Sequence, residues 1–403
     1  MDDKPTLGVE EEYAIIDPES RELKAHINTM MRGEGPGRRR VIGENILFHP
    51  ELHQSVVEVA TPVCRDIHDA RRDILRLRRA VIGKAESTGA RIAAVGTHPF
   101  SDWKEQRITN RKRYRQIVED LQDMARANLI FGLHVHVGVE NKEVAVEVMN
   151  EARYFLPHLL ALSTSSPFWL GRSSGLKSSR AMIFRRFPRT GIPPQFESAA
   201  ALSRFTDTLI DTGSIRDASK IWWDLRAHHK YPTVEFRICD LTTTVEETLC
   251  IVALVQAIVA RLRLLRAENL GFRRYSRALL EENKWRAMRH GVHGRLIDFG
   301  KNREVEFPAL IDELLEFIDP VLDWLDCRQE AEYAAVICQR GTSADRQLAC
   351  YEESGRDLSA VVDMLVQETR RGVLEDGETA DPAASAEIDS LEMGSGRSTG
   401  EQA

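Results

Sequence analysis

The chain of 403 residues lacks the motifs that most often reveal a nucleotide, metal or redox site at once. Its six cysteines include no Cys-x-x-Cys pair, so neither a zinc site nor a disulfide framework is indicated. No Gly-x-x-x-x-Gly-Lys-Ser/Thr or Gly-x-Gly-x-x-Gly occurs, which argues against P-loop and Rossmann modes of nucleotide binding. Any nucleotide chemistry must therefore use another type of site.

Long apolar runs are also scarce. The most apolar stretch, 249–260, is interrupted by Gln256, and it falls short of the roughly 20 residues that cross a bilayer. The first residues are polar and are followed by no signal-peptide h-region. We therefore expect a cytoplasmic protein with no membrane partner, in which 249–260 is a candidate core helix or homodimer interface.

A broad excess of basic charge is missing as well. The formal net charge is −7, and the segment 375–403 alone accounts for it, with eight carboxylates and one arginine. The neutral remainder argues against a nucleic-acid-binding protein, which would carry a basic surface. The tail is poor in large apolar residues, a composition typical of disorder. We predict one catalytic domain over 1–374 and a disordered acidic tail over 375–403.

Alternating apolar and polar residues predict strands mainly in the first part of the chain. The expected strands are 6–16, 55–61, 129–139 and 233–239. Strict alternation favours antiparallel pairing with one face of the sheet open. The expected fold class is therefore α+β, with a strand-rich part over 1–240 and a helical part over 241–374.

Helix signals lie between these strands. Asp66 is expected to cap a helix that runs to about Ser87. Two more helices are predicted over 108–128 and 144–163, the second with a kink at Pro157. The stretches 32–40 and 171–194 are expected to be irregular.

Glutamates fall in or beside two of the predicted strands. Glu10 and Glu12 share one face of the first strand, with Cβ atoms about 7 Å apart. Glu58 lies between valines in a largely apolar strand, and Glu51 precedes that strand. A buried carboxylate is costly unless it is paired or bound to a metal, and such oxygens suit hard cations. A solvated acidic strand end and a salt-bridged glutamate are the alternatives.

Two further strands carry imidazole and guanidinium groups. His134 and His136 share a strand face, where paired imidazoles suit a metal ion or a phosphate oxygen. Glu235 and Arg237 also share a face, and this sets a metal-binding carboxylate beside the guanidinium that phosphoryl transfer requires. A surface ion pair is the alternative for these last two residues.

A basic segment precedes the last strand. Residues 172–194 contain six Arg or Lys and no acid, and they include Lys177, Arg180, Arg185 and Arg186. Guanidinium groups bind phosphate oxygens well, so the segment is a candidate for holding nucleotide phosphates. A solvated basic loop is the alternative.

Taken in order, five stretches resemble the glutamate–cysteine ligase type 2 family, bacterial carboxylate–amine ligases with a glutamine-synthetase-like catalytic fold. They are GVEEEY at 8–13, SVVEVATPVC at 55–64, FGLHVHVG at 131–138, GLKSSRAMIFRRFPRTGIPP at 175–194 and KIWWDLRAHHKYPTVEFRICD at 220–240. The resemblance covers about residues 6–370. It implies a curved antiparallel sheet of about six strands, flanked by helices.

The resemblance also implies a role for each residue named above. The family's metal ligands correspond to Glu10, Glu12, Glu51, Glu58, His134 and Glu235. Arg237 matches the arginine beside the last of these glutamates and is the expected catalytic residue. The residues expected to bind ATP or its phosphates are Lys177, Arg180, Arg185, Arg186 and His136.

The implied reaction is the ATP-dependent formation of an amide through an acyl phosphate. Carboxylates would hold two or three Mg²⁺ ions, and an imidazole ligand makes Mn²⁺ an acceptable substitute. By analogy the substrates are glutamate and L-cysteine, and the product is γ-glutamylcysteine. Three alternatives stay open: a guanidino or phosphagen kinase, a metal hydrolase built on His134 and His136, and a non-catalytic nucleotide-binding protein.

Overall fold

The computed structural model describes residues 3–31, 40–41 and 47–374. In this part of the chain eight strands form one sheet, in the order β2-β3-β4-β1-β6-β10-β9, and β5 pairs with β1. All of these pairings are antiparallel. The strands are β1 (Leu7–Ile16), β2 (Arg40–Val41), β3 (Leu47–Pro50), β4 (Val56–Ala60), β5 (Arg91–Ala93), β6 (Leu133–Gly138), β9 (Leu225–Ala227) and β10 (Thr233–Phe236). The predicted α+β fold class is confirmed, with more strands than the six expected.

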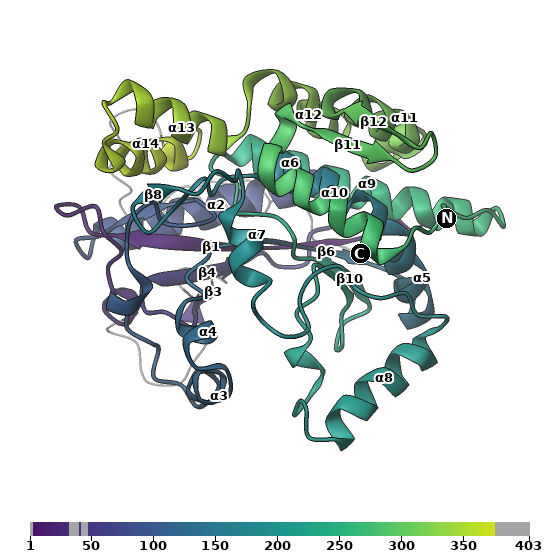
Figure 1. Cartoon of the computed structure of the whole chain (residues 1–403), viewed down its shortest axis with the longest axis horizontal. Coiled ribbons are helices and arrows are strands. Elements are labelled where there is room, and N and C mark those ends of the chain that lie inside the picture. The colour runs from purple at the N-terminus through teal and green to yellow at the C-terminus, as the bar shows by residue number, and fades with distance from the viewer. Residues whose placement is uncertain (1–2, 32–39, 42–46, 375–403) are drawn as a thin grey trace, which may run out of the picture.

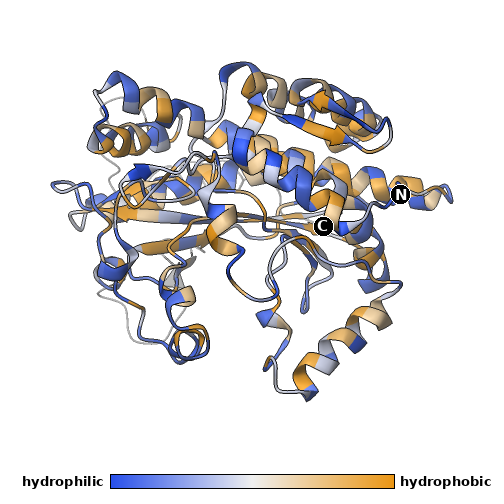
Figure 2. Cartoon of the chain, viewed as in Figure 1, coloured by the Kyte–Doolittle hydropathy of each residue, from blue (hydrophilic) through white to orange (hydrophobic). Residues whose placement is uncertain are grey.

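A layer of helices covers one face of this sheet (Figure 1). The helices that pack on its strands include α2 (Ile67–Glu86), α9 (Val245–Ala267) and α14 (Leu358–Arg370). Against these helices or one another pack α6 (Leu156–Ser163), α10 (Arg277–His290), α11 (Phe307–Leu325), α12 (Arg328–Arg340) and α13 (Ser343–Glu353). Hydrophobic colour runs along the central strands and through this layer (Figure 2). The main core therefore lies between the sheet and the helical layer.

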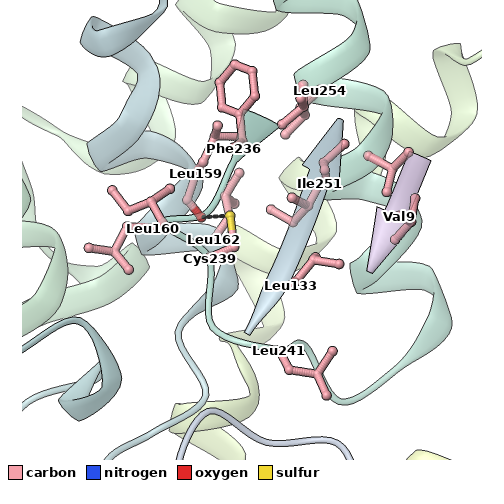
Figure 3. Close-up of a cluster of buried hydrophobic side chains, with 14 of the residues drawn as sticks. Val9, Leu133, Leu159, Leu160, Leu162, Phe236, Cys239, Leu241, Ile251 and Leu254 are labelled. Carbon is pink, nitrogen blue, oxygen red and sulfur yellow. Dashed lines mark hydrogen bonds between the residues drawn. The ribbon is translucent and has the colours of Figure 1, made fainter. Parts of the chain in front are cut away.

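The centre of the core is the longest helix, α9. Ile251 and Leu254 of α9 cluster with Val9 of β1, Leu133 of β6 and Phe236 of β10 (Figure 3). By length and composition α9 could cross a bilayer, but 83% of its most apolar window is buried inside the protein. The apolar stretch 249–260 is thus a core helix, and it leaves no surface for the interface considered as the alternative.

Other elements lie on the opposite side of the sheet. There α3 (Lys112–Leu121) and α4 (Asp123–Arg126) extend from one end of the sheet, and α8 (Ala199–Asp211) extends from the other (Figure 1). The stretch predicted to be irregular contains a short helix, α7 (Ser179–Phe184). This helix can begin there because Ser178 caps its N-terminus by accepting from the Ala181 N–H at 3.2 Å. Two-stranded hairpins form at β7 (Phe168–Trp169) with β8 (Arg172–Ser173), and at β11 (Arg295–Asp298) with β12 (Arg303–Glu306).

Helices are present in all three predicted segments, but two of these segments are divided into separate helices. Asp66 caps α2 as expected, accepting from the Asp69 N–H at 2.9 Å. The predicted helix 144–163 is two helices, α5 (Lys142–Ala152) and α6, separated by a 3₁₀ turn. Pro157 does not kink a continuous helix; it lies in the first turn of α6, where its missing N–H costs nothing. The predicted helix 108–128 is broken at Gln122, which has φ +48°.

Two predictions fall on residues that the structure does not describe. The acidic tail 375–403 lies wholly outside the described residues, and so does 32–39 of the predicted loop. Within the described part, all strands of the main sheet precede residue 240, and 241–374 is mostly helical apart from the β11–β12 hairpin. The division into a domain and a tail stays a prediction.

Candidate active site

Strand pairing brings the predicted ligands together on the sheet face opposite α9. Glu12 of β1 lies directly across from Glu58 of β4, and Glu10 lies across from His134 of β6. Residues directly opposite in an antiparallel pair point to the same face. The two glutamates of β1 therefore share a surface with side chains from strands far away in the sequence.

The same surface continues onto β10 and β9. His136 of β6 lies across from Glu235 of β10, and Glu235 lies across from Arg226 of β9. Arg226 grips Glu235 with two hydrogen bonds, Nε to Oε2 at 2.5 Å and Nη2 to Oε1 at 3.1 Å. Arg226 is not among the residues predicted from the sequence, although the turn residues 228–232 between two alternating runs signal the hairpin that pairs it with Glu235.

Three of these side chains form a group that could hold a cation. One ligand atom each from Glu10, His136 and Glu235 lies within 4.8 Å of the others. His136 Nε2 is 3.5 Å from Glu10 Oε1 and 3.9 Å from Glu235 Oε1, and it is buried without a hydrogen bond to any described residue. Thr233 Oγ1, at 3.2 Å from Nδ1, fixes the ring orientation. A buried nitrogen between two carboxylates suits a metal ion.

His134 is placed differently. Its Nδ1 lies 3.1 Å from Glu10 Oε2 and 3.5 Å from Arg237 Nη1. Burial and the nearby Arg237 charge lower the pKa of His134 to about 4, so the imidazole is neutral near pH 7. Burial alone would raise the pKa of Glu10, but its contacts with His134 and His136 hold that pKa well below the usual range.

A second acidic group lies next to the first. Burial raises the pKa of Glu12 to about 7, and the nearby Glu51 carboxylate raises it too. Burial also raises the pKa of Glu58 well above its usual value, and repulsion from Glu10, Glu51 and Glu12 adds to the shift. Glu12, Glu51 and Glu58 are only partly exposed. Carboxylates crowded in this way either bind protons or bind cations.

Glu51 reaches this group from the end of β3. Its Oε2 accepts from the Leu52 N–H at 3.2 Å, and the Tyr114 hydroxyl of α3 lies 3.4 Å from Oε1. Burial raises the pKa of Glu51, and the charge of Arg113 opposes that rise. Helix α3 therefore brings an arginine and a tyrosine toward the acidic face. The sequence marked neither residue.

Arg237 lies in the middle of the charged groups. Its Nη1 donates to Glu235 Oε1, while its Nε is buried and has no hydrogen-bond partner in the described part of the chain. Burial would raise the pKa of Glu235, but the charges of Arg237 and Arg226 hold it far below the usual range. Glu235 is thus a carboxylate shared by two guanidinium groups, and the free Nε of Arg237 leaves a donor for another anion.

Arg180 is the one residue of the predicted basic set whose charge acts on the acidic face. It is buried and donates to the main-chain carbonyls of Ile238 and Arg237, both at 3.2 Å. Its charge lowers the pKa of Glu12. Gly132 makes room for it, because a Cβ there would lie 2.2 Å from Arg180 Nη2.

The other three basic residues make contacts elsewhere among the described residues. Lys177 Nζ lies 2.5 Å from Asp345 of α13. Arg185 pairs with Glu281 of α10, and Arg186 donates to the main-chain carbonyl that follows α4 at 2.9 Å. The predicted role of these three in ATP binding has no support from these contacts and stays a prediction.

A large cavity adjoins the cation-binding group. Its volume is about 680 Å³, and Glu10, His136 and Thr233 form part of its lining. The rest of the lining comes from residues 3–9 before and within β1, from the end of β4 and the end of β6 with the residues that follow each, from the β9–β10 turn, and from Arg263 of α9. Its apolar residues include Pro5, Leu7, Val9, Pro62, Val139 and Pro232. The cavity can thus take a partly apolar molecule that also carries charged groups.

Comparison with known proteins identifies the family. The pattern of glutamate–cysteine ligase family 2 matches residues 6–374. The chain belongs to this family. A Sorangium cellulosum relative provisionally named glutamate–cysteine ligase 2 is 54% identical over 93% of this chain and 98% of its own length. A Chloroflexus aggregans relative with the same provisional name is 53% identical over 91% of this chain and 93% of its own.

Solved structures support the fold of this family member. A glutamate–cysteine ligase from Francisella tularensis, in complex with AMP, has a TM-score of 0.64 at 10% identity and covers 98% of this chain and 96% of its own. A bifunctional glutathione synthetase from Pasteurella multocida has a TM-score of 0.67 at 14% identity, over 92% of this chain and 53% of its own. The predicted family is confirmed by the family match and by the relatives above 50% identity. Family membership supports the expected enzyme class, an ATP-dependent ligase.

Proposed function

We propose that the protein is a carboxylate–amine ligase that joins glutamate to L-cysteine through an acyl phosphate. The observation that carries the proposal is the row of carboxylates and imidazoles across β4, β1, β6 and β10, with Arg237 among them. Phosphoryl transfer needs cations and a guanidinium close together, and this face supplies donors for both.

The donor set fits hard divalent cations, with Mg²⁺ as the proposed ion and Mn²⁺ as a substitute. Glu10 and Glu235, with the free Nε2 of His136, offer one position. The raised pKa values of Glu12 and Glu58 support a second position, because crowded carboxylates bind cations to relieve their repulsion. Bound there, the cations would neutralise phosphate charge and orient the nucleotide.

The 680 Å³ cavity is the proposed site for the nucleoside part of ATP. Its apolar lining suits a heterocyclic base, and Glu10 and His136 at its edge place the phosphate end next to the proposed cation positions. Tyr231, which is 58% exposed, also lines the cavity and stacks on His228 with ring centroids 4.9 Å apart. An exposed aromatic ring of this kind offers a face for base stacking.

Arg237 and Arg180 have separate proposed roles. Arg237 has a buried Nε with no hydrogen bond among the described residues, so it can donate to the phosphoryl group in transit. Arg180 lies beside Gly132 and acts electrostatically on Glu12. We assign Arg180 to the carboxylate substrate or its acyl phosphate, at the end of the face away from the cavity.

The proposed chemistry has two steps. A substrate carboxylate oxygen attacks the γ-phosphorus of ATP, which forms the acyl phosphate and releases ADP. The amine nitrogen then attacks the acyl carbon, phosphate leaves with the bonding electrons, and the nitrogen loses a proton. Residues of this face bind the charged groups, orient them and exclude water from the acyl phosphate.

The decisive experiment measures ADP release with Mg-ATP over a matrix of amino-acid carboxylates and amines. Mass spectrometry should detect γ-glutamylcysteine, or another amide, in the wells that release ADP. A phosphorylated product without an amide would instead identify a kinase. No ADP release in any well would refute the proposed ligase activity.

A further inference from the structure

A second cavity lies outside the acidic face. Its volume is about 370 Å³, and it lies between α3, the residues that follow α7, and the segment between α8 and β9. None of the residues predicted to bind metal or ATP lines it. It contains five residues that matter for what it can bind: Asp120, Arg189, Arg216, Lys220 and Trp222.

Positive charge dominates this cavity. Arg189, Arg216 and Lys220 line it, and Asp120 is the one carboxylate among the described residues of its lining. Arg113 lies close enough to act electrostatically on Lys220, and so does the carboxylate of Asp217. Four basic groups thus face two acidic ones, and one of those acids is engaged: Asp217 caps a 3₁₀ turn by accepting from the Ser219 N–H at 2.8 Å.

Two of the basic groups lack an acidic or hydrogen-bonding partner among the described residues. The Lys220 ammonium and the Arg216 guanidinium form no hydrogen bond and no ion pair with the described residues, whereas most of the described arginines have a partner of one kind or the other. Burial lowers the pKa of Lys220, and the neighbouring charge of Arg113 lowers it further. Holding like charges together has an electrostatic cost, which a bound anion would offset.

An aromatic ring holds part of the cluster in place. The Arg189 guanidinium carbon lies 5.7 Å from the centre of the Trp222 ring, and Lys220 Nζ lies 5.9 Å from it. Arg189 Nε also donates to the Lys220 carbonyl at 2.9 Å. Both cations are therefore positioned on one ring before any ligand arrives, which lowers the entropy lost on binding.

We propose that this cavity binds a small organic anion that carries two or more carboxylates. Lys220 and Arg216 would take the charge, as ammonium and guanidinium groups do for carboxylates. Ile117, Leu121 and Ile215 add apolar surface beside Trp222, and this surface favours a carbon skeleton over a bare inorganic ion. The volume lies within the range of small-molecule sites, about 300–1,000 Å³. The proposal does not depend on the ligase activity.

Glutarate is the probe, and calorimetry on the full chain without ATP or divalent metal is the measurement. Glutaramide has the same skeleton without charge, and inorganic phosphate has charge without a skeleton. We expect glutarate to bind, glutaramide to give no signal, and phosphate to bind more weakly. Equal affinity for phosphate and glutarate would overturn the organic class of ligand, and no glutarate binding at millimolar concentration would overturn the site.

Variants locate the binding. Lys220→Gln and Arg216→Gln should each weaken glutarate binding about tenfold, the loss expected for one charge-assisted hydrogen bond. Arg204→Gln, an exposed arginine on α8 that lines neither cavity, is the matched control and should bind normally. Unchanged affinity in both cavity variants would place glutarate elsewhere and refute the proposal.

A second readout does not require the variants to fold. Partial acetylation of the wild-type protein, followed by peptide mass spectrometry, reports how accessible the Lys220 amine is. Glutarate should protect Lys220 and leave Lys104, an exposed lysine outside the cavity lining, unprotected. Equal labelling of Lys220 with and without saturating glutarate would contradict a ligand at this position.

Discussion

Replacing Glu12 with glutamine should stabilise the metal-free protein while destroying its activity. Glu12 is one of three crowded glutamates, and burial with the Glu51 charge raises its pKa to about 7 from 4.5. Glutamine keeps the shape and can still accept from the Gly132 N–H, which lies 2.7 Å from Glu12 Oε2. The substitution therefore removes a charge and leaves most of the packing intact.

The magnitude follows from the shift in pKa. A carboxyl group whose pKa is higher in the folded protein than in the unfolded chain stabilises the fold. This stabilisation is complete only below the pKa of the unfolded chain, and it is lost as the pH rises through the pKa of the folded protein. Each unit corresponds to about 1.4 kcal/mol, so the ionised Glu12 costs on the order of 3 kcal/mol well above pH 7. Because the side chain is partly exposed, solvent screening reduces the expected gain to about 1–3 kcal/mol.

Urea denaturation in EDTA measures the effect. We expect Glu12→Gln to unfold at higher urea than wild type at about pH 8, with an advantage that shrinks as the pH falls toward 5. Added Mg²⁺ should stabilise wild type and reverse the order. Glu19→Gln, an exposed glutamate in the turn after β1, is the control and should change neither curve. A metal-free variant no more stable than wild type at pH 8 would refute the account of a crowded cation site.

Three further predictions concern the site and the fold beneath it. Arg237→Lys should lower kcat by about 10²–10³ with little change in the KM for ATP, because ammonium cannot replace the guanidinium fork; a large rise in KM with unchanged kcat would instead assign Arg237 to nucleotide binding. His136→Asn should weaken Mn²⁺ binding, followed by EPR, more than His134→Asn, since only His136 Nε2 faces two carboxylates; the reverse order would make His134 the ligand. Arg78→Met should destabilise the protein by about 3–5 kcal/mol in denaturant, because it leaves the Glu11 carboxylate buried without its partner; a smaller loss would show that Glu11 is otherwise satisfied.

The sequence predicted the acidic face well because strand periodicity is a local property. Alternation alone places Glu10 with Glu12, and His134 with His136, on one face of each strand. Which strands are neighbours depends on tertiary pairing. The register that sets His136 across from Glu235 could not be obtained from either segment alone.

The basic segment shows where sequence reasoning failed to discriminate. Four basic residues look equivalent in a run without acids: Lys177, Arg180, Arg185 and Arg186. Of these four, only Arg180 has its guanidinium group next to Gly132. The others reach acids or carbonyls on distant elements. The side chains point in different directions because the short helix α7 lies in this segment. The helix and its cap at Ser178 were not predicted, because the stretch looked irregular. Composition indicates a basic segment, but helix geometry decides which side chain enters the site.

Three consecutive glutamates in β1 show how one strand can serve two environments. Glu10 and Glu12 face the ligand side, and Glu11 points into the core between them. There Arg78 of α2 donates to Glu11 at 2.5 Å and 3.2 Å, and the Tyr13 hydroxyl donates at 2.5 Å. A shift of β1 by one residue would bury Glu10 and Glu12 against apolar helices and expose Val9 and Tyr13 to the ligand side.

The buried pair therefore fixes the register on which the candidate site depends. Apolar residues in place of Glu11 and Arg78 could pack as well, and replacing a buried ion pair in this way is often neutral or stabilising. Such a replacement would lose the penalty against slippage. Arg78 also donates to Thr248 Oγ1 and to the Thr243 carbonyl, and these bonds hold its guanidinium at the position of Glu11. The ligand face and the ion pair behind it are thus set by the same alternation of side chains along β1.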